Sequence, residues 1–440
     1  MNLLAHASRK RKLQKHLGMR TVCYTARAMS VAFGSDFFAG NRDRLRQLFT
    51  GTAPIVLTAH GALQRGGDEA FPFKQDSSFW YLTGINLPDI ILVIDKGREY
   101  LIVPTRDPIY ETFDGAIDRD ALARQSGIQE ILTEKEGWKA LESRLKKVRH
   151  VATLAANPAY LDFYGMYTNP ARRALIRRLK KVNGDMELLD LRQHIGRMRM
   201  IKQPVELAAL QEAIDITNET IKDVMRPAKR SRYAHEYEIE ADISRGFRYR
   251  GALGHGFTPI VASGEHACTL HHTANNGLLA SDELVIIDVG AHASFYTADI
   301  SRTLALSEKP SRRQQQVHEA VCQAQDYAYS LLKPGVYLKS YEQQMEAFVG
   351  EKLRELGLIK SITRETVRDS GLFPHATSHF LGLDAHDAGD YERPLEPGVV
   401  ITVEPGIYIR AEGLGVRIED DVLITEDGCE VLSKKLPRNL

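Results

Sequence analysis

The stretch Leu284-Val285-Ile286-Ile287-Asp288-Val289 places an aspartate at the end of an apolar run. A charge there costs free energy unless another group pairs with it. A second aspartate follows eleven residues later, in Tyr296-Thr297-Ala298-Asp299-Ile300. A hairpin that turns at His292-Ala293-Ser294 would set Asp288 beside Asp299, because cross-strand partners share a face. Two adjacent carboxylates repel, so this arrangement indicates a cation between them.

The same pattern occurs again further along the chain. Glu404 ends the apolar run Val399-Val400-Ile401-Thr402-Val403, and Glu419 follows fifteen residues later. A pairing of Glu404 with Glu419 has its centre inside the turn-like Arg410-Ala411-Glu412-Gly413. The alternative is that each carboxylate pairs with a local arginine or caps a backbone end. Two hairpins that each offer a facing carboxylate pair favour a metal site over that alternative.

Histidines supply the other candidate ligands. His375, His379 and His386 fall within twelve residues, and His271 and His272 follow Leu270. One histidine alone is usually a structural group, whereas three beside duplicated carboxylates indicate metal ligands or proton carriers. One imidazole with four carboxylates makes a mostly oxygen site whose negative charge calls for more than one divalent cation. Mn²⁺ fits first, followed by Co²⁺, Fe²⁺ or Zn²⁺.

Such a site points to a hydrolase. Two metal ions about 3.5–4 Å apart can hold a bridging hydroxide as the nucleophile, polarise a carbonyl and stabilise a tetrahedral oxyanion. The implied reaction is hydrolysis of an amide or ester, with a carboxylate such as Glu404 moving the proton. A non-catalytic binding protein is the alternative from another class.

Composition limits the class of protein. The chain has 440 residues, 43% of them hydrophobic and 26% charged, which suits a globular protein of two or three domains. Apolar runs stay short of the roughly 18 residues that a membrane span needs, so we expect no membrane partner. Residues 1–35 hold seven basic and no acidic residues, which leaves a mildly acidic body and argues against nucleic acid as a partner.

The cysteines and the first residues bear on the compartment. Only four cysteines occur, none close together, so neither a disulfide framework nor a zinc–cysteine site is expected, and the cytoplasm is the simplest compartment. The basic extension 1–35 is expected to be disordered or to precede the true start of translation, although its charge also suits organelle targeting. Folded structure is expected to begin near Ser35.

The remaining chain divides into two predicted domains. Residues 36–196 alternate strand-like and helical stretches, which predicts an α/β domain. In residues 197–440, two helices followed by strands occur twice, which predicts an α+β domain of duplicated halves.

Several motifs resemble those of the pita-bread metallopeptidases, which include methionine aminopeptidase, prolidase and aminopeptidase P. The matching stretches are Ile287-Asp288-Val289-Gly290, Ala298-Asp299-Ile300-Ser301-Arg302-Thr303, Thr377-Ser378-His379, Val403-Glu404-Pro405-Gly406 and Arg417-Ile418-Glu419-Asp420-Asp421. The resemblance implies a curved antiparallel sheet with flanking helices. It also implies a dinuclear site with ligands Asp288, Asp299, His379, Glu404 and Glu419, of which Asp299 and Glu419 bridge both metals. His271, His375 and His386 match non-ligand histidines that contact the substrate or the oxyanion.

The N-terminal half narrows the resemblance. The stretch Phe71-Pro72-Phe73-Lys74-Gln75-Asp76-Ser77-Ser78-Phe79-Trp80-Tyr81-Leu82-Thr83-Gly84 is similar to the bacterial aminopeptidase P pattern. That similarity implies cleavage between an N-terminal residue and a following proline, in peptides with proline at the second position. An X–Pro bond lacks the N–H that general peptidases often bind. Prolidase, which cuts only Xaa-Pro dipeptides, is the alternative.

Two residues carry further expectations from the family. The residue matching Trp80 reaches a neighbouring subunit's site, which implies substrate contact and a homo-oligomer, a dimer or tetramer. Core packing is the alternative for Trp80, because Phe79-Trp80-Tyr81 alone indicates a strand. Arg417 is expected either to bind a substrate carboxylate or carbonyl, or to neutralise the cluster from Glu419 to Asp421.

Overall fold

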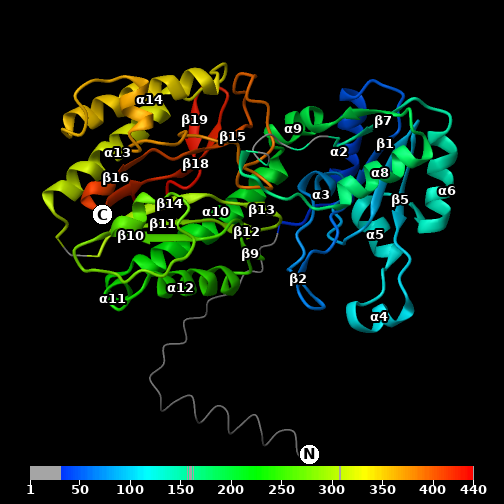
Figure 1. The fold of residues 1–440 in the computed structure, drawn as a ribbon, viewed down its shortest axis with the longest axis horizontal. Helices are drawn as coiled ribbons and strands as arrows, with labels where there is room; N and C mark the ends of the chain where they lie inside the picture. The colour runs from blue at the N-terminus through cyan, green and yellow to red at the C-terminus, as the bar shows by residue number, and fades with distance from the viewer. Residues whose placement is uncertain (1–30, 156, 158–160, 162, 307–308, 440) are drawn as a thin grey trace, which may run out of the picture.

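The computed structural model describes residues 31–155, 157, 161, 163–306 and 309–439, which form two lobes side by side (Figure 1). Residues 1–30, most of the extension expected to be disordered or untranslated, lie outside the described residues. Helix α2 (Ser35–Leu48) begins at Ser35, where we expected folded structure to start. Among the described helices, none is both long and apolar enough to cross a membrane.

The N-terminal lobe is built on a six-stranded mixed sheet in the order β6-β5-β4-β1-β7-β8. Its strands are β1 (Ile55–Thr58), β4 (Ile91–Asp95), β5 (Arg98–Val103), β6 (Glu130–Thr133), β7 (His150–Thr153) and β8 (Glu187–Asp190). A tight turn joins β4 to β5, with positive φ at Lys96 and Gly97. A short hairpin, β2 (Gln64–Gly66) and β3 (Glu69–Ala70), lies outside this sheet.

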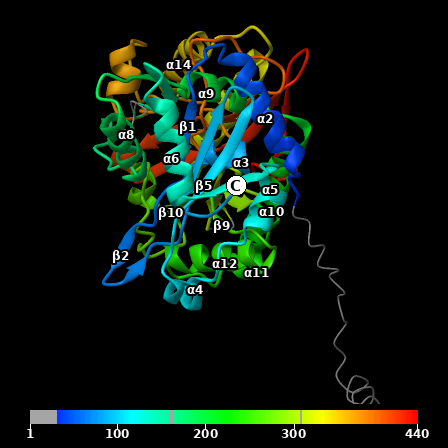
Figure 2. The ribbon, with the colours of Figure 1, turned by 90° about the vertical axis from the view of Figure 1, so that its right-hand side faces the viewer.

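Helices cover both faces of this sheet (Figure 2). Trp138, Leu141 and Leu179 pack with Val56 and Val151 on one face. The other face packs against a larger aromatic and aliphatic core that continues into the second lobe. The helices of this lobe are α2, α3 (Ser77–Thr83), α4 (Pro108–Asp114), α5 (Arg119–Ser126), α6 (Glu134–Leu145), α8 (Ala171–Val182) and α9 (Arg192–Met200). The lobe is therefore the α/β domain that the sequence predicts.

The second lobe has two halves of similar construction. In the first, α10 (Pro204–Met225) and α12 (Glu236–Tyr249) pack on β10 (Ile260–Ser263), β11 (Leu284–Val289) and β14 (Ile300–Ala305). In the second, α13 (Arg312–Leu331) and α14 (Leu338–Glu355) pack on β15 (Val400–Val403), β16 (Gly406–Ile409), β17 (Leu414–Arg417) and β18 (Asp420–Ile424). Shorter elements are α11 (Pro227–Arg230), β9 (Gly254–His255), β12 (Ala291–Ala293), β13 (Tyr296–Thr297) and β19 (Cys429–Val431). The duplicated antiparallel arrangement confirms the predicted fold class.

The two halves are joined by hydrogen bonds that backbone N–H groups of the second hairpin donate to β14. The backbone N–H of Arg417 donates to Thr303 Oγ1 at 3.1 Å, and that of Glu419 donates to the Ser301 carbonyl at 3.1 Å. The predicted boundary between residues 196 and 197 falls inside α9, which leads into α10 through a short connection. The domain limits themselves stay a prediction.

The second carboxylate hairpin has the predicted register and the first does not. In the second, Gly406 pairs with Arg417 and Val403 with Asp420, so Glu404 lies opposite Glu419. In the first, Asp288 pairs with Ser301, two residues beyond the expected Asp299. A shift of two residues keeps the same face of the strand, so the expected side of the sheet is preserved.

The shift follows from the turn. Ala293 pairs with Tyr296, and the two residues between them, Ser294 and Phe295, have φ of 49° and 67°. A two-residue turn with left-handed backbone at both central positions is usually formed by Asn-Gly. The sequence Ser-Phe does not predict such a turn. The turn is stabilised from outside, because Ser294 Oγ donates to Glu212 Oε2 at 2.6 Å and Phe295 stacks on Trp80.

The expected strand at Phe79-Trp80-Tyr81 is wrong, because these residues lie in helix α3. The Asp76 carboxylate accepts the backbone N–H of Phe79 as an N-cap, and Gly84 ends the helix with a left-handed backbone, φ 71°. These two caps define a helix of seven residues, about two turns, and they outweigh the β propensity of the aromatic residues.

Gly290 provides a test of how tightly the first hairpin is packed. A Cβ at Gly290 would lie 1.6 Å from the carbonyl oxygen of Ala298, so Gly290→Ala must displace backbone next to Asp299. We expect a loss of about 1–3 kcal/mol in the free energy of unfolding, seen as a lower Tm. Gly428→Ala, where a Cβ meets open space, is the matched control and should leave Tm unchanged. An equal Tm for the two variants would contradict this packing.

Candidate metal centre

The predicted ligands from three separate segments meet in one buried place. Ligand atoms of Asp299, His379 and Glu419 all lie within 4.8 Å of one another. His379 Nε2 is 3.4 Å from Glu404 Oε1 and 3.7 Å from Asp299 Oδ2. Four of the five predicted ligands therefore share this cluster, on the inner side of both hairpins.

Asp288, the fifth predicted ligand, lies beside this cluster and faces an arginine. Its Oδ2 accepts from Arg417 Nη2 at 2.6 Å, while its Oδ1 is buried with no hydrogen-bond partner. A buried carboxylate oxygen without a partner is unusual and leaves one ligand position free.

Backbone and hydroxyl groups orient the ligands. Glu419 Oε2 accepts from Ser301 Oγ at 2.8 Å, and the backbone N–H of Asp299 donates to the Asp421 carboxylate at 3.3 Å. His379 Nδ1 lies 3.1 Å from its neighbour's carbonyl oxygen, at Phe380. A carbonyl can only accept, so Nδ1 donates and Nε2 presents its lone pair to the carboxylates, as in most protein metal sites.

Electrostatics show that the cluster suits cations. Burial, followed by the charges of neighbouring carboxylates, raises the pKa of Asp299 and of Glu404 well above the usual range, and raises that of Glu419 to about 8. Burial and the adjacent His386 lower the pKa of His379 to about 3, so the imidazole is a neutral lone-pair donor at pH 7. Carboxylates that repel one another beside a neutral imidazole fit divalent metal ions.

The three expected non-ligand histidines surround the cluster. The His386 ring lies 4.2 Å from that of His379, centroid to centroid, and His375 Nδ1 is 3.7 Å from Glu404 Oε2. Burial and the cations Arg417 and Arg368 lower the pKa of His375 to about 4. His271 is exposed, and it is near enough to His386 to contribute, after burial, to the lowered pKa of that imidazole.

Arg417 is engaged by the protein itself. Its three nitrogens donate to Asp288 Oδ2, Ser301 Oγ and Tyr408 Oη, and its residue surface is 3% exposed. The arginine therefore neutralises Asp288, a partner that the sequence analysis did not name, and its charge also acts to lower the pKa of Glu419, which burial raises, as expected of a residue that neutralises that cluster. Its contact with substrate stays a prediction.

Tyr408 is a site residue that the sequence analysis missed. Its hydroxyl lies 2.7 Å from His375 Nε2 and accepts from Arg417 at 3.1 Å. Its position four residues after Glu404 in one extended segment was the available signal, since alternate residues of extended backbone share a face. Burial raises the pKa of Tyr408 to about 12, so the phenol stays protonated and can donate to His375.

Trp80 does not lie at this centre. It is 2% exposed within the N-terminal core, where it stacks on Phe295 at 4.5 Å and meets Phe33 and Phe38 edge to face. Within its own chain Trp80 therefore packs in the core, as the alternative expects, and its contact with substrate in a neighbouring subunit stays a prediction. Because Phe295 forms the tip of the first hairpin, Trp80 holds that hairpin against the N-terminal lobe.

Comparisons with known proteins agree with this geometry. A model of the metallopeptidase family M24 matches residues 208–426, and a model of the aminopeptidase P N-terminal domain matches residues 38–152. The Xaa-Pro aminopeptidase of Escherichia coli K12 is 30% identical over 427 residues, which cover 92% of this chain and 96% of that protein. Xaa-Pro aminopeptidase 3 of Homo sapiens is 32% identical over 408 residues, covering 88% and 79%.

Solved structures show the same likeness. The low-pH form of aminopeptidase P from E. coli has a TM-score of 0.79 at 30% identity and covers 93% of this chain and 97% of that chain. The E. coli enzyme is also known with the inhibitor Pro-Leu and, with zinc substituted, in complex with product. Fold and site thus define a metallopeptidase with an M24 catalytic domain. The chain belongs to the aminopeptidase P family of that class, and the predicted family and enzyme class are confirmed.

The raised pKa values make the stability of the metal-free protein depend on pH. Glu419 keeps its proton up to about pH 8 when folded, whereas the unfolded carboxyl loses it near its usual pKa of 4.5. Its contribution to the free energy of unfolding is therefore lost as pH rises through 8. Buried histidines act in the opposite direction only below about pH 6.5, their usual pKa. We expect Tm of the metal-free protein to fall between pH 7 and 8.5.

Bound metal should abolish this fall, because cations then balance the ionised carboxylates. Differential scanning fluorimetry with a chelator or with Mn²⁺ measures both curves, and Glu419→Gln, which cannot ionise, should flatten the metal-free curve in part. If Tm of the metal-free protein stays constant or rises from pH 7 to 8.5, ionisation of these carboxylates does not control its stability.

Proposed function

We propose that this chain is a metal-dependent Xaa-Pro aminopeptidase, which hydrolyses the bond between an N-terminal residue and a following proline. The observation that carries the proposal is the buried cluster of Asp299, His379, Glu404 and Glu419, beside Asp288 with its free oxygen. Full-length likeness to Xaa-Pro aminopeptidases supports the choice of substrate.

Two divalent cations, with Mn²⁺ the first candidate, suit the five ligands Asp288, Asp299, His379, Glu404 and Glu419, with Asp299 and Glu419 shared between them. When bound, they would act as Lewis acids that polarise the scissile carbonyl and lower the pKa of water. The ligand set is mostly oxygen with one imidazole, which favours hard or borderline ions over thiophilic ones.

Proton movement falls to Glu404. A carboxylate at the edge of the cluster, next to His375, can accept a proton from the attacking water and pass it on to the leaving group. Glu404 Oε2 faces His375 Nδ1 at 3.7 Å, and His375 in turn bonds Tyr408. His375 and Tyr408 therefore form a polar wall next to the proton carrier, where a substrate carbonyl or a developing oxyanion can be bound.

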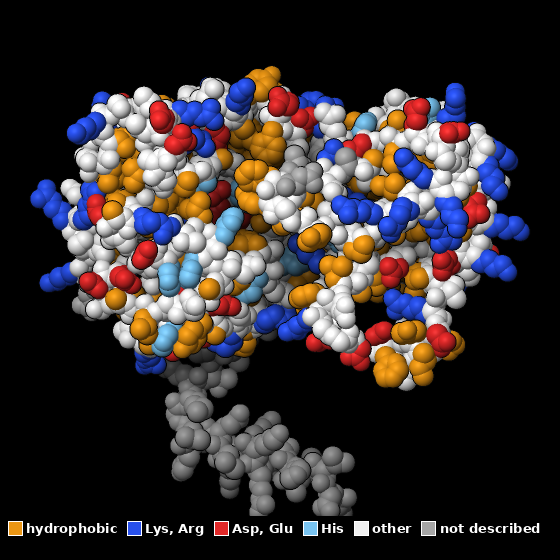
Figure 3. All heavy atoms as spheres, in the orientation of Figure 1, with side chains coloured by type: hydrophobic (Ala, Val, Ile, Leu, Met, Phe, Trp, Pro, Cys, Tyr) orange, Lys and Arg blue, Asp and Glu red, His pale blue; other side chains and the backbone are white. Residues whose placement is uncertain are grey.

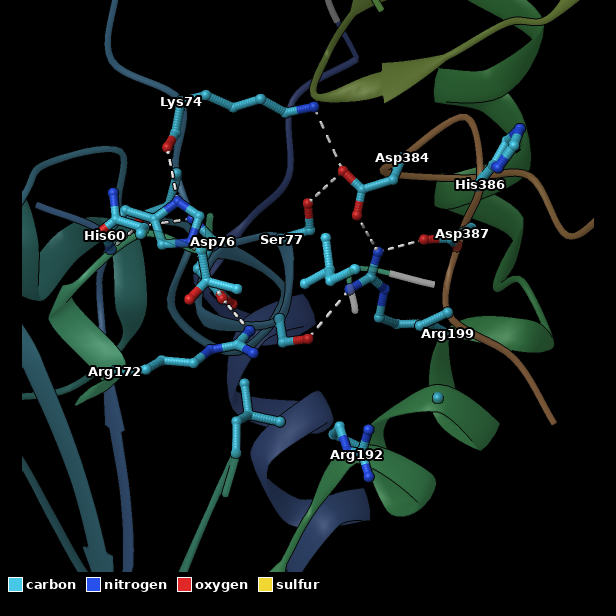
Figure 4. Close-up of a pocket in the computed structure, with 18 of the residues that line it drawn as sticks. His60, Lys74, Asp76, Ser77, Arg172, Arg192, Arg199, Asp384, His386 and Asp387 are labelled. Atoms are coloured by element: carbon cyan, nitrogen blue, oxygen red, sulfur yellow. Dashed lines mark hydrogen bonds and ion pairs between the residues drawn. The ribbon is translucent and has the colours of Figure 1, made fainter. Parts of the chain in front are cut away.

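A deep cleft leads away from this centre between the two lobes (Figure 4). It has a volume of about 980 Å³, and its wall includes His386, whose ring centroid lies 4.2 Å from that of His379, together with His60, Lys74 and Arg172 of the N-terminal lobe. Arg199 and Lys74 both bond Asp384 and thereby tie the two walls together. Because His386 borders both the cleft and the metal centre, we infer that a peptide continues past His386 into this cleft, which favours an aminopeptidase over prolidase.

Subunit assembly and compartment stay predictions. A homo-oligomer, dimer or tetramer, now rests on family likeness alone, because Trp80 is buried within its own chain. The cytoplasm remains the simplest compartment, since Cys268, Cys322 and Cys429 are free thiols.

The decisive assay compares peptide lengths. With Mn²⁺ added, we expect cleavage of an Xaa-Pro-Yaa tripeptide and of longer Xaa-Pro peptides in preference to the Xaa-Pro dipeptide, because the cleft accommodates the residues after proline. Release of the free N-terminal residue, measured by chromatography, reports the rate. Glu404→Ala should lower kcat by about 100-fold or more, since it removes both a ligand and the proton carrier.

Glu412→Ala is the matched control. Glu412 lies in the same hairpin and pairs with Arg313 at the surface, so this variant should keep wild-type activity. Cleavage of the dipeptide alone would identify a prolidase with the same metal chemistry. If metal binds and neither peptide is cleaved, the proposal is wrong and a binding protein on this fold is the better description.

A further inference from the structure

A second group of metal-ligating side chains lies in the catalytic lobe, outside the proposed dinuclear centre. Glu236, the first residue of α12, and two histidines of the segment that follows β10, His266 and His272, bring one ligand atom each to within 4.8 Å of one another. Histidine side chains gather over this lobe on the face shown in Figure 3. We propose that Glu236, His266 and His272 form a separate mononuclear site for a borderline divalent cation, with Zn²⁺ as the best fit.

The ligand atoms converge on one carboxylate. His272 Nε2 lies 2.9 Å from Glu236 Oε2, and His266 Nδ1 lies 3.1 Å from Glu236 Oε1. Ligands of a tetrahedral zinc ion are about 3.4 Å apart, given bond lengths of about 2.1 Å. The two imidazole rings stack with centroids 4.1 Å apart, so a modest rotation of the more exposed His266 ring would direct both lone pairs to one ion.

The carboxylate is held in place for this purpose. The backbone N–H groups of Ser263 and Gly277 donate to Glu236 at 2.8 and 2.7 Å, and Ser263 Oγ adds a third bond at 2.9 Å. Although burial acts to raise it, these hydrogen bonds keep the pKa of Glu236 below its usual value. The side chain is fully buried yet ionised, which is costly unless cationic groups or a metal ion balance it.

Space and access also suit an ion. The His266 side chain is 43% exposed, whereas that of His272 is 11% exposed, so the site opens to solvent on one side. Gly277 closes the other side, where a Cβ would come within 2.8 Å of both His266 and Glu236. Glu283 is close enough to contribute to the electrostatics of the site and adds negative charge. Three protein ligands with one open position is an arrangement typical of zinc.

The site is linked to the proposed catalytic centre through one loop. His272 Nε2 lies 2.9 Å from Glu236 Oε2. The adjacent His271 is close enough to His375 and His386 at the dinuclear centre for its charge, in addition to burial, to help lower the pKa of each. An ion that fixes His272 would therefore also restrict the backbone that carries His271.

Zinc counting tests the proposal. The full-length protein is equilibrated with excess Zn²⁺, freed of loosely bound ions by dialysis, and its zinc measured by plasma mass spectrometry. We expect three zinc ions per chain in the wild type and two in His266→Gln, because glutamine can still donate a hydrogen bond to Glu236 without supplying an imidazole. His272→Gln is the second variant and should give the same loss.

The control is His150→Ala, which removes an exposed histidine that pairs with Glu187 alone, and it should keep three ions. Tm without metal should be equal for wild type and His266→Gln, whereas added Zn²⁺ should raise Tm further in the wild type. Equal zinc counts in the wild type and in both glutamine variants would overturn the proposal and leave the cluster as a hydrogen-bonded brace. The difference of one ion between wild type and variant reports this site alone, whatever number of ions the dinuclear centre holds.

Discussion

The interaction on which this molecule depends is the repulsion among carboxylates buried in one place. Asp299, Glu404 and Glu419 approach one another where burial alone already opposes their ionisation. Two hairpins from two halves of the catalytic lobe must be held together against this repulsion. Ser301 contributes by bonding Glu419 with both its carbonyl and its hydroxyl, and Arg417 does so by neutralising Asp288. The packed helices and the N-terminal lobe serve to fix these hairpins until cations balance the charge.

Sequence patterns placed the ligands, but tertiary contacts set the details of the first hairpin. The second hairpin turns at Gly413, whose left-handed backbone is an ordinary glycine signal, and its register could be predicted. The first turns on Ser294 and Phe295, which adopt left-handed backbone only because Glu212 and Trp80 hold them. Those contacts join residues far apart in the chain, so local propensity could not have revealed the shift of two residues.

The surroundings of the ligands were harder to predict than the ligands themselves. Carboxylates at the ends of apolar runs stand out in a sequence, because burial makes each one costly. Tyr408 carries no such signal, since a tyrosine in a strand usually packs. Trp80 was ambiguous for the opposite reason, because its neighbours favour a strand while Asp76 and Gly84 cap a helix. The caps prevail over β propensity there, because each cap satisfies backbone groups that would otherwise stay unpaired.

The most direct measurement is the electron paramagnetic resonance of the chain titrated with Mn²⁺, an ion that prefers the oxygen-rich cluster over imidazole-rich sites. We predict two Mn²⁺ ions per chain with a spin-coupled spectrum. Asp299→Asn should abolish the coupling because it removes a carboxylate expected to bridge the two ions, whereas Asp326→Asn, at an exposed position, should preserve it. One uncoupled ion in the wild type, or an unchanged coupled spectrum in Asp299→Asn, would contradict a dinuclear centre built on these carboxylates.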